Sequence, residues 1–269
     1  MIVIFNLIGG GSNAASKFPE FTYTGTYELI DDGIAADDKT QNWRIKFLTS
    51  GVLKFTKVVD SIQVFLVGGG GGGGTTRGDG GGGGGGYTKT FSSEVEKNVE
   101  YTITVGSGGS VQGDGGSTTA FGQTANGGKA GWGYGNTGDP YRGIGGNGGS
   151  GGAGGGGNED TAGAGGSNGS NGGKASYHAA GTGQGTTTKE FGESNGTLYS
   201  GGGGAGKNIH DSAGGGAGGA GGGGKGGSQN IAAVAGTTNL GGGGGGGGAD
   251  GGGKAGGSGI VVIRNIRTP

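Results

Sequence analysis

The sequence contains no cysteine, only three prolines and two histidines, and a single methionine among 269 residues. Without cysteine the chain can form neither a disulfide nor a thiolate metal site, and a Cys–His catalytic pair is impossible. The formal net charge is −1, which argues against nucleic acid and against an anionic membrane surface as partners. The apolar segment 1–8 lacks a basic flank and is too short to insert across a bilayer, so we interpret it as a strand or docking segment.

Glycine is the residue that the chain has in excess, with 87 copies. A glycine content near one third suggests collagen, but collagen requires a strict Gly-X-Y period and abundant proline, and neither is present. Disorder usually combines low hydrophobicity with a high net charge, which this chain lacks. The composition therefore favours an ordered fold in which glycine itself forms the interior.

Segments rich in β-formers lie on both sides of the glycine. Alternating apolar residues at 43–47, a Ser-Gly turn and Leu53 and Phe55 predict a hairpin. Further strands are predicted at 21–30, 61–67, 87–91, 101–105 and 117–122, and at the C-terminal run 259–264. We expect the last of these to pair beside an early strand such as 62–67.

The predicted fold class is all-β: a β-sandwich, jelly-roll-like, with a large inserted bundle of glycine-rich polyproline-II or polyglycine-II helices. We expect residues 1–19 to form an N-terminal docking segment and linker. Residues 20–122 are predicted to form the sandwich with a polyglycine insert, closed by 259–267, and residues 123–258 to form the bundle.

A Gly-Gly-X period would allow such helices to pack, because X then projects along one edge and the other positions carry no side chain. Runs of this kind occur from Gly145, Gly214 and Gly251. The bulkier segments between them, at 129–143, 174–200, 207–212 and 228–240, are predicted to be turns and tip loops joining adjacent helices.

Motifs for catalysis or ion binding are missing. A Walker A motif fails at Gly206-Lys207-Asn208, and no nucleophile elbow frames a serine. The segment with Asp31, Asp32, Asp37 and Asp38 does not match EF-hand spacing, which favours a solvated loop. We therefore expect no enzyme activity, no cofactor and no metal site.

Aromatic residues in the bulky segments have two open interpretations. They could wedge between helix layers, or they could form a sugar- or protein-binding tip, because aromatic rings offer large contact areas with a polar handle. The candidate receptor-binding residues are Trp132, Tyr134, Tyr141, Arg142, Tyr177, His178 and Tyr199.

The order of these features resembles a known family. A strand ending SIQVFLVGGGGGGG, the segments GGYTKTFSSEVEKNVEYTITVGSGG and GGSTTAFG, a long glycine block and the closing GGSGIVVIR resemble the glycine-rich domain of bacteriophage tail proteins. The interleaved loops are similar to those of the distal tail-fibre adhesins of T-even-like phages. The strand and glycine pattern is also similar to the ectodomain of anaplastic lymphoma kinase-type receptors, but the cysteines of that family are missing.

The resemblance implies a tail-fibre or tail-tip component of the virion that recognises a bacterial surface receptor, protein or glycan, during adsorption to the host cell. It further implies that the N-terminal segment contacts other phage tail proteins, and a homotrimer is one possible assembly. The alternative is a purely structural tail or cell-surface protein without receptor binding. An ice-binding protein would need a flat, regular threonine or alanine face, whereas the threonines at 186–188 form only a short cluster.

Overall fold

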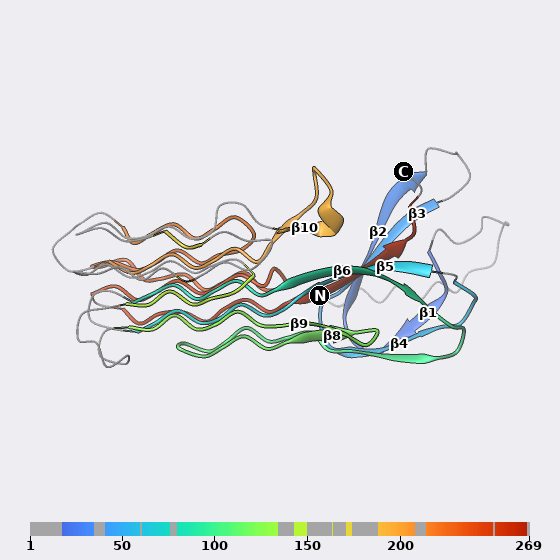
Figure 1. Cartoon of the computed structure of the whole chain (residues 1–269), viewed down its shortest axis with the longest axis horizontal. Helices are drawn as coiled ribbons and strands as arrows, with labels where there is room; N and C mark the ends of the chain where they lie inside the picture. Colours follow the sequence, from blue (N-terminus) through green and yellow to red (C-terminus); the bar gives the residue numbers. More distant parts are fainter. Residues whose placement is uncertain are drawn as a thin grey trace.

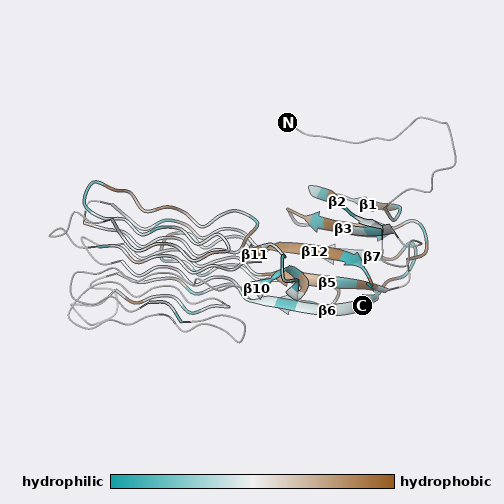
Figure 2. Cartoon of the chain, turned by 90° about the horizontal axis from the view of Figure 1, so that it is seen from above, coloured by the Kyte–Doolittle hydropathy of each residue, from teal (hydrophilic) through white to brown (hydrophobic). Residues whose placement is uncertain are grey.

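The computed structural model describes residues 18–34, 41–59, 61–75, 80–133, 143–149, 163, 171–173, 188–207, 214–249 and 251–267. Its β-strands gather at one end, and long glycine-rich segments run side by side from that end to the other (Figure 1). The hydropathy colouring separates the two parts, because β12 carries a strongly apolar segment while the glycine-rich segments are pale over most of their length (Figure 2).

The described strands form antiparallel sheets and confirm the all-β prediction. A five-stranded sheet has the order β2-β3-β12-β5-β6, and a three-stranded sheet has the order β1-β4-β7. The strand bounds of the first are Tyr27–Ile34, Gln41–Phe47, Ile260–Asn265, Ser61–Val67 and Thr88–Glu94, and those of the second are Phe21–Tyr23, Gly51–Phe55 and Glu100–Ile103. Two small pairs complete the set: β8 (Thr118–Ala120) with β9 (Gln123–Ala125), and β10 (Thr188–Lys189) with β11 (Leu198–Tyr199).

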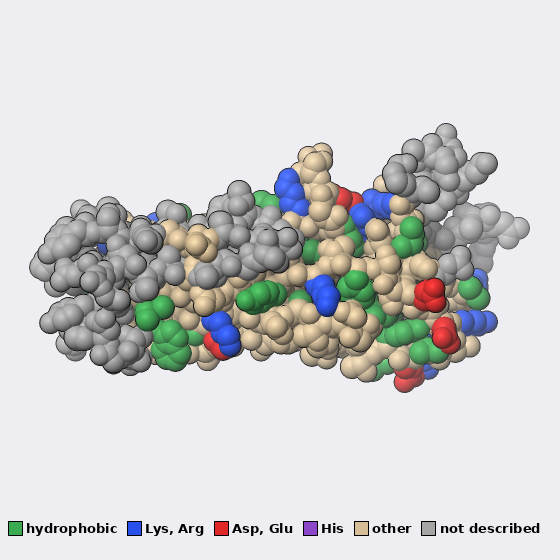
Figure 3. Space-filling view, viewed as in Figure 1, with side chains coloured by type: hydrophobic (Ala, Val, Ile, Leu, Met, Phe, Trp, Pro, Cys, Tyr) green, Lys and Arg blue, Asp and Glu red, His purple; other side chains and the backbone are tan. Residues whose placement is uncertain are grey.

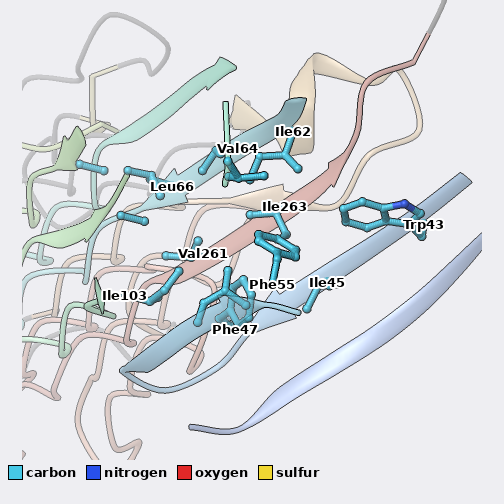
Figure 4. Close-up of a cluster of buried hydrophobic side chains, with 14 residues drawn as sticks. Trp43, Ile45, Phe47, Phe55, Ile62, Val64, Leu66, Ile103, Val261 and Ile263 are labelled. Atoms are coloured by element: carbon cyan, nitrogen blue, oxygen red, sulfur yellow. The ribbon is translucent and has the colours of Figure 1, made fainter. Parts of the chain in front are cut away.

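The hydrophobic core lies where these two sheets meet. Strands β3, β5 and β12 each point alternate apolar side chains into it from the larger sheet, and β4 and β7 contribute Leu53, Phe55 and Ile103 from the smaller one (Figure 4). Phe47, Phe55 and Ile45 are completely buried. Removing a large side chain from such a position typically costs about 3–5 kcal/mol.

The predicted hairpin at 43–55 is wrong. Trp43, Ile45 and Phe47 do share one face, as their spacing indicated, but β3 and β4 belong to different sheets. Residues 48–50 carry the chain from one sheet across the core to the other. Alternation reports which face of a strand is buried, and it cannot distinguish a hairpin within one sheet from an arch between two.

The C-terminal strand is the centre of the larger sheet, and its predicted pairing with an early strand is confirmed. β12 pairs antiparallel with β5, with Ile260 opposite Val67 and Val262 opposite Phe65, and on its other side it pairs with β3. The prediction of a solvated loop for the aspartate-rich segment is wrong in part. Asp31 and Asp32 lie within β2, at a register shift next to Gly33, whereas Asp37 and Asp38 lie outside the described residues.

Strand β5 continues directly into the glycine segment 68–75, whose backbone hydrogen bonds repeat every three residues. The amides of Gly68, Gly71 and Gly74 donate to the carbonyls of residues 87, 84 and 81. Those of Gly69 and Gly72 donate to residues 116 and 113, and those of Gly70 and Gly73 donate to residues 257 and 254. In each series the donor number rises by three as the acceptor number falls by three, so the paired segments are antiparallel.

The carbonyls of the same segment accept bonds from three further segments. Gly70 and Gly73 accept from residues 109 and 112, Gly69 and Gly72 from residues 128 and 131, and Gly71 and Gly74 from residues 244 and 247. Segment 68–75 is therefore hydrogen-bonded to six neighbours, and its glycines from Gly68 to Gly74 are all buried. A buried backbone group must find a partner, and here every three consecutive residues supply hydrogen bonds to six neighbouring segments.

A side chain has no room at these positions. A Cβ built on Gly71 would lie 2.0 Å from the carbonyl oxygen of Lys129, and one on Gly148 would lie 1.9 Å from that of Gly85. The obstacle is the backbone of a neighbouring segment, which cannot move aside without breaking its own hydrogen bonds. Gly251 differs, since a Cβ there would meet nothing within 4 Å.

This contrast gives a matched pair of variants. Gly71→Ala should lower the free energy of unfolding by at least the roughly 1–3 kcal/mol of an overpacked interior. Gly251→Ala should leave it unchanged or raise it slightly, because alanine restricts the unfolded chain. Urea unfolding followed by circular dichroism measures both, and equal midpoints for the two variants would contradict the packing described here.

Candidate functional site

The end of the glycine region far from the sheets is a layer of residues joined by direct backbone hydrogen bonds. Gly74 donates to the carbonyl of residue 81, Gly81 to that of Trp132, Gly80 to that of Gly247, and Gly206 to that of Gly80. We call this set the distal layer. The described residues on either side of 76–79, 134–142 and 208–213 lie at or next to this layer, at the end of the glycine region away from the sheets (Figure 1).

Trp132 is the predicted receptor-binding residue that this layer contains. Its amide donates to the carbonyl of Ile144 at 2.8 Å and the reverse bond is 3.1 Å, so the two residues form an isolated antiparallel bridge. The Trp132 side chain is 40% exposed. Tyr134, Tyr141, Arg142, Tyr177 and His178 lie outside the described residues.

The prediction that Tyr199 is a surface recognition residue is wrong. It is 1% exposed and packs against Phe65, with ring centroids 5.2 Å apart, in a second apolar cluster with Val67, Ile260 and Val262. The Ser200 amide donates to the Leu240 carbonyl, so residue 200 lies next to the sheets and not at the distal layer. The prediction of a tip loop for 174–200 therefore fails for its described part, residues 188–200.

These residues cover the face of the larger sheet that points away from the core. β10, the short 3-10 helix Glu190–Gly192 and β11 lie over β3, β5 and β12, and Phe191 packs against the second apolar cluster. Phe191 has φ of 52°, an unusual conformation for a bulky residue, and it places the ring 4.0 Å from the Arg264 guanidinium. We call residues 188–200 the cover segment.

A network of charges joins the cover segment to the sheet. Arg44 binds Asp32 at 2.8 Å and Glu193 at 3.1 Å, and it also contacts Glu190. Lys46 lies 3.0 Å from Glu190 and donates to the Tyr199 hydroxyl, which in turn donates to Glu190. Arg264 and Arg267 both reach Glu193, and Arg267 also binds Asp32.

The pKa of Glu190 reflects this surrounding. Its carboxylate is completely buried, and burial alone would raise the pKa. The hydrogen bond from Tyr199 and the charges of Lys46 and Arg44 outweigh burial, so the pKa of Glu190 lies below its ordinary value. Burial and the adjacent Glu190 charge raise the pKa of the Tyr199 hydroxyl, which keeps it protonated as a donor.

The family model for the glycine-rich domain matches residues 49–265, from just before β4 to the end of β12. The chain belongs to the glycine-rich domain family. Among curated proteins, none matches it.

The part of the glycine-rich domain that the structure describes holds no group of three or more side chains suited to a metal ion. No described helix is long and apolar enough to cross a membrane. The described residues thus form a hydrogen-bonded distal layer at one end and a cover segment that ion pairs hold on the sheet at the other.

Sequence reasoning about this glycine-rich domain missed the charge network, although part of its signal was present. The alternation that buries Trp43, Ile45 and Phe47 also puts Arg44 and Lys46 together on the opposite face. Two basic side chains on the covered face of a central strand require acidic partners. Nothing in the sequence indicated that Glu190 and Glu193, almost 150 residues later, supply them.

The charge network around Glu190 predicts that the folded protein loses stability in acid. A carboxylate whose pKa is lower in the folded state than in the unfolded state stabilises the fold above its ordinary pKa of about 4.3. That stability is lost as the pH falls through the lower pKa of the folded state. Glu190→Gln should therefore cost about 3 kcal/mol at pH 7, because Arg44 and Lys46 lose a buried counter-charge, and the difference from the wild type should shrink in acid.

Thermal unfolding measured from pH 7 to pH 3 tests this, with Glu100→Gln as the control. Glu100 pairs with Lys54 at the surface, where the side chains are 62% and 36% exposed, so its loss should change stability by less than about 1 kcal/mol. If the unfolding temperatures of the wild type and Glu190→Gln change in parallel with pH, the role given to the Glu190 carboxylate is wrong.

Proposed function

We propose that the hydrogen-bonded glycine segments are polyproline-II helices packed as a polyglycine-II bundle, and that the two larger sheets form a jelly-roll-like β-sandwich that frames it. The three-residue repeat of hydrogen bonds supports the first part, because polyproline II has three residues per turn and no internal hydrogen bonds. The core shared between the two sheets supports the second part.

We further propose that the chain is a bacteriophage tail-fibre or tail-tip protein that recognises the host bacterial surface through loops held on this scaffold. The observation that carries the proposal is the distal layer, where hydrogen bonds join Gly74, Gly80, Trp132, Gly206 and Gly247 at one end of the bundle. A rigid scaffold that gathers several connections at a single end is well suited to presenting a binding surface.

We assign recognition to the segments that connect the glycine segments, and not to the bundle interior, because only the connecting segments carry large polar and aromatic side chains. Glycine offers a partner no side chain to discriminate, whereas segment 134–142 carries Tyr134, Tyr141 and Arg142 and lies between Trp132 and Ile144. Tyr177 and His178 are the further candidates. Such segments can change sequence without altering the glycine packing, so a phage could change host at low structural cost.

In this proposal the protein works in the virion tail, without catalysis or a cofactor. Its N-terminal segment would contact other tail proteins, and its partner on the host is a surface protein or glycan. The sheet end, which holds the N-terminal strands, lies opposite the distal layer, and this arrangement suits a chain attached at one end and binding at the other (Figure 1).

Replacing residues 134–142 with a Gly-Ser segment of equal length tests the proposal. The variant should unfold at the wild-type temperature and lose at least tenfold in binding of the fluorescently labelled chain to cells of the bacterium on which the encoding phage grows. The control replaces Lys57 and Val58, exposed residues between β4 and β5, with Gly-Ser.

Two outcomes would count against it. If the 134–142 replacement binds cells as the wild type does, recognition does not reside in that segment. If the wild-type chain itself binds no host cells, the alternative of a purely structural tail or cell-surface protein is the better account.

A further inference from the structure

Three neighbouring segments of the glycine region expose a side chain at every third residue. Between these positions the residues are buried or half-buried, since they face other segments. The exposed or half-exposed positions are Val111, Asp114 and Ser117 in the first segment, Asn126, Lys129 and Trp132 in the second, and Ile144 and Asn147 in the third.

Backbone hydrogen bonds fix how these segments lie beside one another. Gly115 donates to the carbonyl of residue 128, and Lys129 and Trp132 donate to the carbonyls of Asn147 and Ile144. The register therefore sets Asp114, Lys129 and Asn147 in one row across the three segments. Trp132 and Ile144 form the next row toward the distal layer, and Val111 lies in the tight turn 110–113 that precedes Asp114.

We call these six residues the lateral platform: Val111, Asp114, Lys129, Trp132, Ile144 and Asn147. Its exposed apolar members include Trp132, which is 40% exposed, and Val111, which is 38% exposed. In its inner row Lys129 lies 2.7 Å from Asp114, and the other oxygen of Asp114 accepts the Ala130 amide at 2.9 Å. On the flank of the bundle, hydrophobic side chains gather beside a pair of opposite charges (Figure 3).

The charge balance and the size of the platform restrict its partner. Lys129 and Asp114 neutralise each other, so a charged ligand has no unpaired opposite charge to meet there. Rows three residues apart are separated by about 9 Å, and hydrogen-bonded neighbours lie about 5 Å apart. The platform thus covers on the order of 200 Å², far below the roughly 800 Å² per partner of a stable protein interface.

We propose that the lateral platform binds an uncharged polysaccharide. A sugar ring has an apolar face of C–H groups that can stack on the exposed indole of Trp132, and hydroxyls at its rim that can bond to the amide, ammonium and carboxylate of the adjacent row. Because the glycine packing fixes the rows at a constant spacing, the site suits a polymer whose units also repeat. This inference deepens the proposed recognition of a bacterial surface and rests on it.

The experiment uses the full chain carrying Trp43→Phe, which leaves Trp132 as the single tryptophan and thus the fluorescent reporter. The probes are two uncharged polysaccharides, dextran and yeast mannan, the neutral polysaccharide purified from the surface of the host bacterium, and hyaluronate as an anionic polymer. At least one of the uncharged polymers should shift the Trp132 emission, and 0.5 M NaCl should leave its affinity unchanged.

Affinity electrophoresis in gels containing that polymer then compares variants. Trp132→Ala should weaken retardation at least tenfold, and Lys129→Ala should weaken it by a smaller factor. The control is Val234→Ala, which shortens a side chain that is 52% exposed and lies outside the platform. All three variants should unfold at the wild-type temperature.

Three results would overturn the inference: no uncharged polymer binds, only hyaluronate binds and salt abolishes it, or Trp132→Ala binds as tightly as Val234→Ala. The proposed function can be judged separately. A chain that binds host cells through 134–142 but ignores every polysaccharide would retain its role in host recognition and lose the lateral platform.

Discussion

The backbone hydrogen bond between neighbouring glycine segments is the interaction on which the rest of this molecule depends. The hydrogen bonds of segment 68–75 repeat every three residues and join its amides and carbonyls to six neighbouring segments. One such bond contributes only about 0.5–1.5 kcal/mol net, and each ordered glycine costs roughly 0.5–1 kcal/mol more than alanine. The arrangement is therefore favourable only when many segments pack together, and only where no Cβ holds them apart.

The glycine region begins and ends at strands of the larger sheet. Strand β5 runs without a break into segment 68–75, and the last glycine segment runs into β12, which pairs with β5. Two termini of the glycine region are thus held side by side by an ordinary hydrophobic core. The cover segment adds a second connection, since its charges bind Arg44 of β3 and Arg264 of β12 while residue 200 leads directly back into the glycine region.

The sequence predicted those features that local chemistry determines. Alternation in 43–47 identified a buried face, and the apolar runs at 61–67 and 259–264 identified two strands that pair. The glycine excess identified an interior without side chains. It failed where distant segments decide the outcome. The arch at 48–50 looks like a hairpin locally, and Tyr199 looks like a loop aromatic until Phe65 and Glu190 are seen around it. Trp132 stays a prediction as a recognition residue, and the sequence could not show that it is exposed in a row beside Ile144.

Amide hydrogen exchange followed by mass spectrometry tests the central claim most directly. If the glycine segments are held by the bonds described, peptides covering 68–74 and 241–248 should exchange as slowly as those of β5 and β12, because all of them open together. If these peptides instead exchange completely at the earliest labelling time while β5 and β12 stay protected, the glycine region is not hydrogen-bonded and the account is wrong.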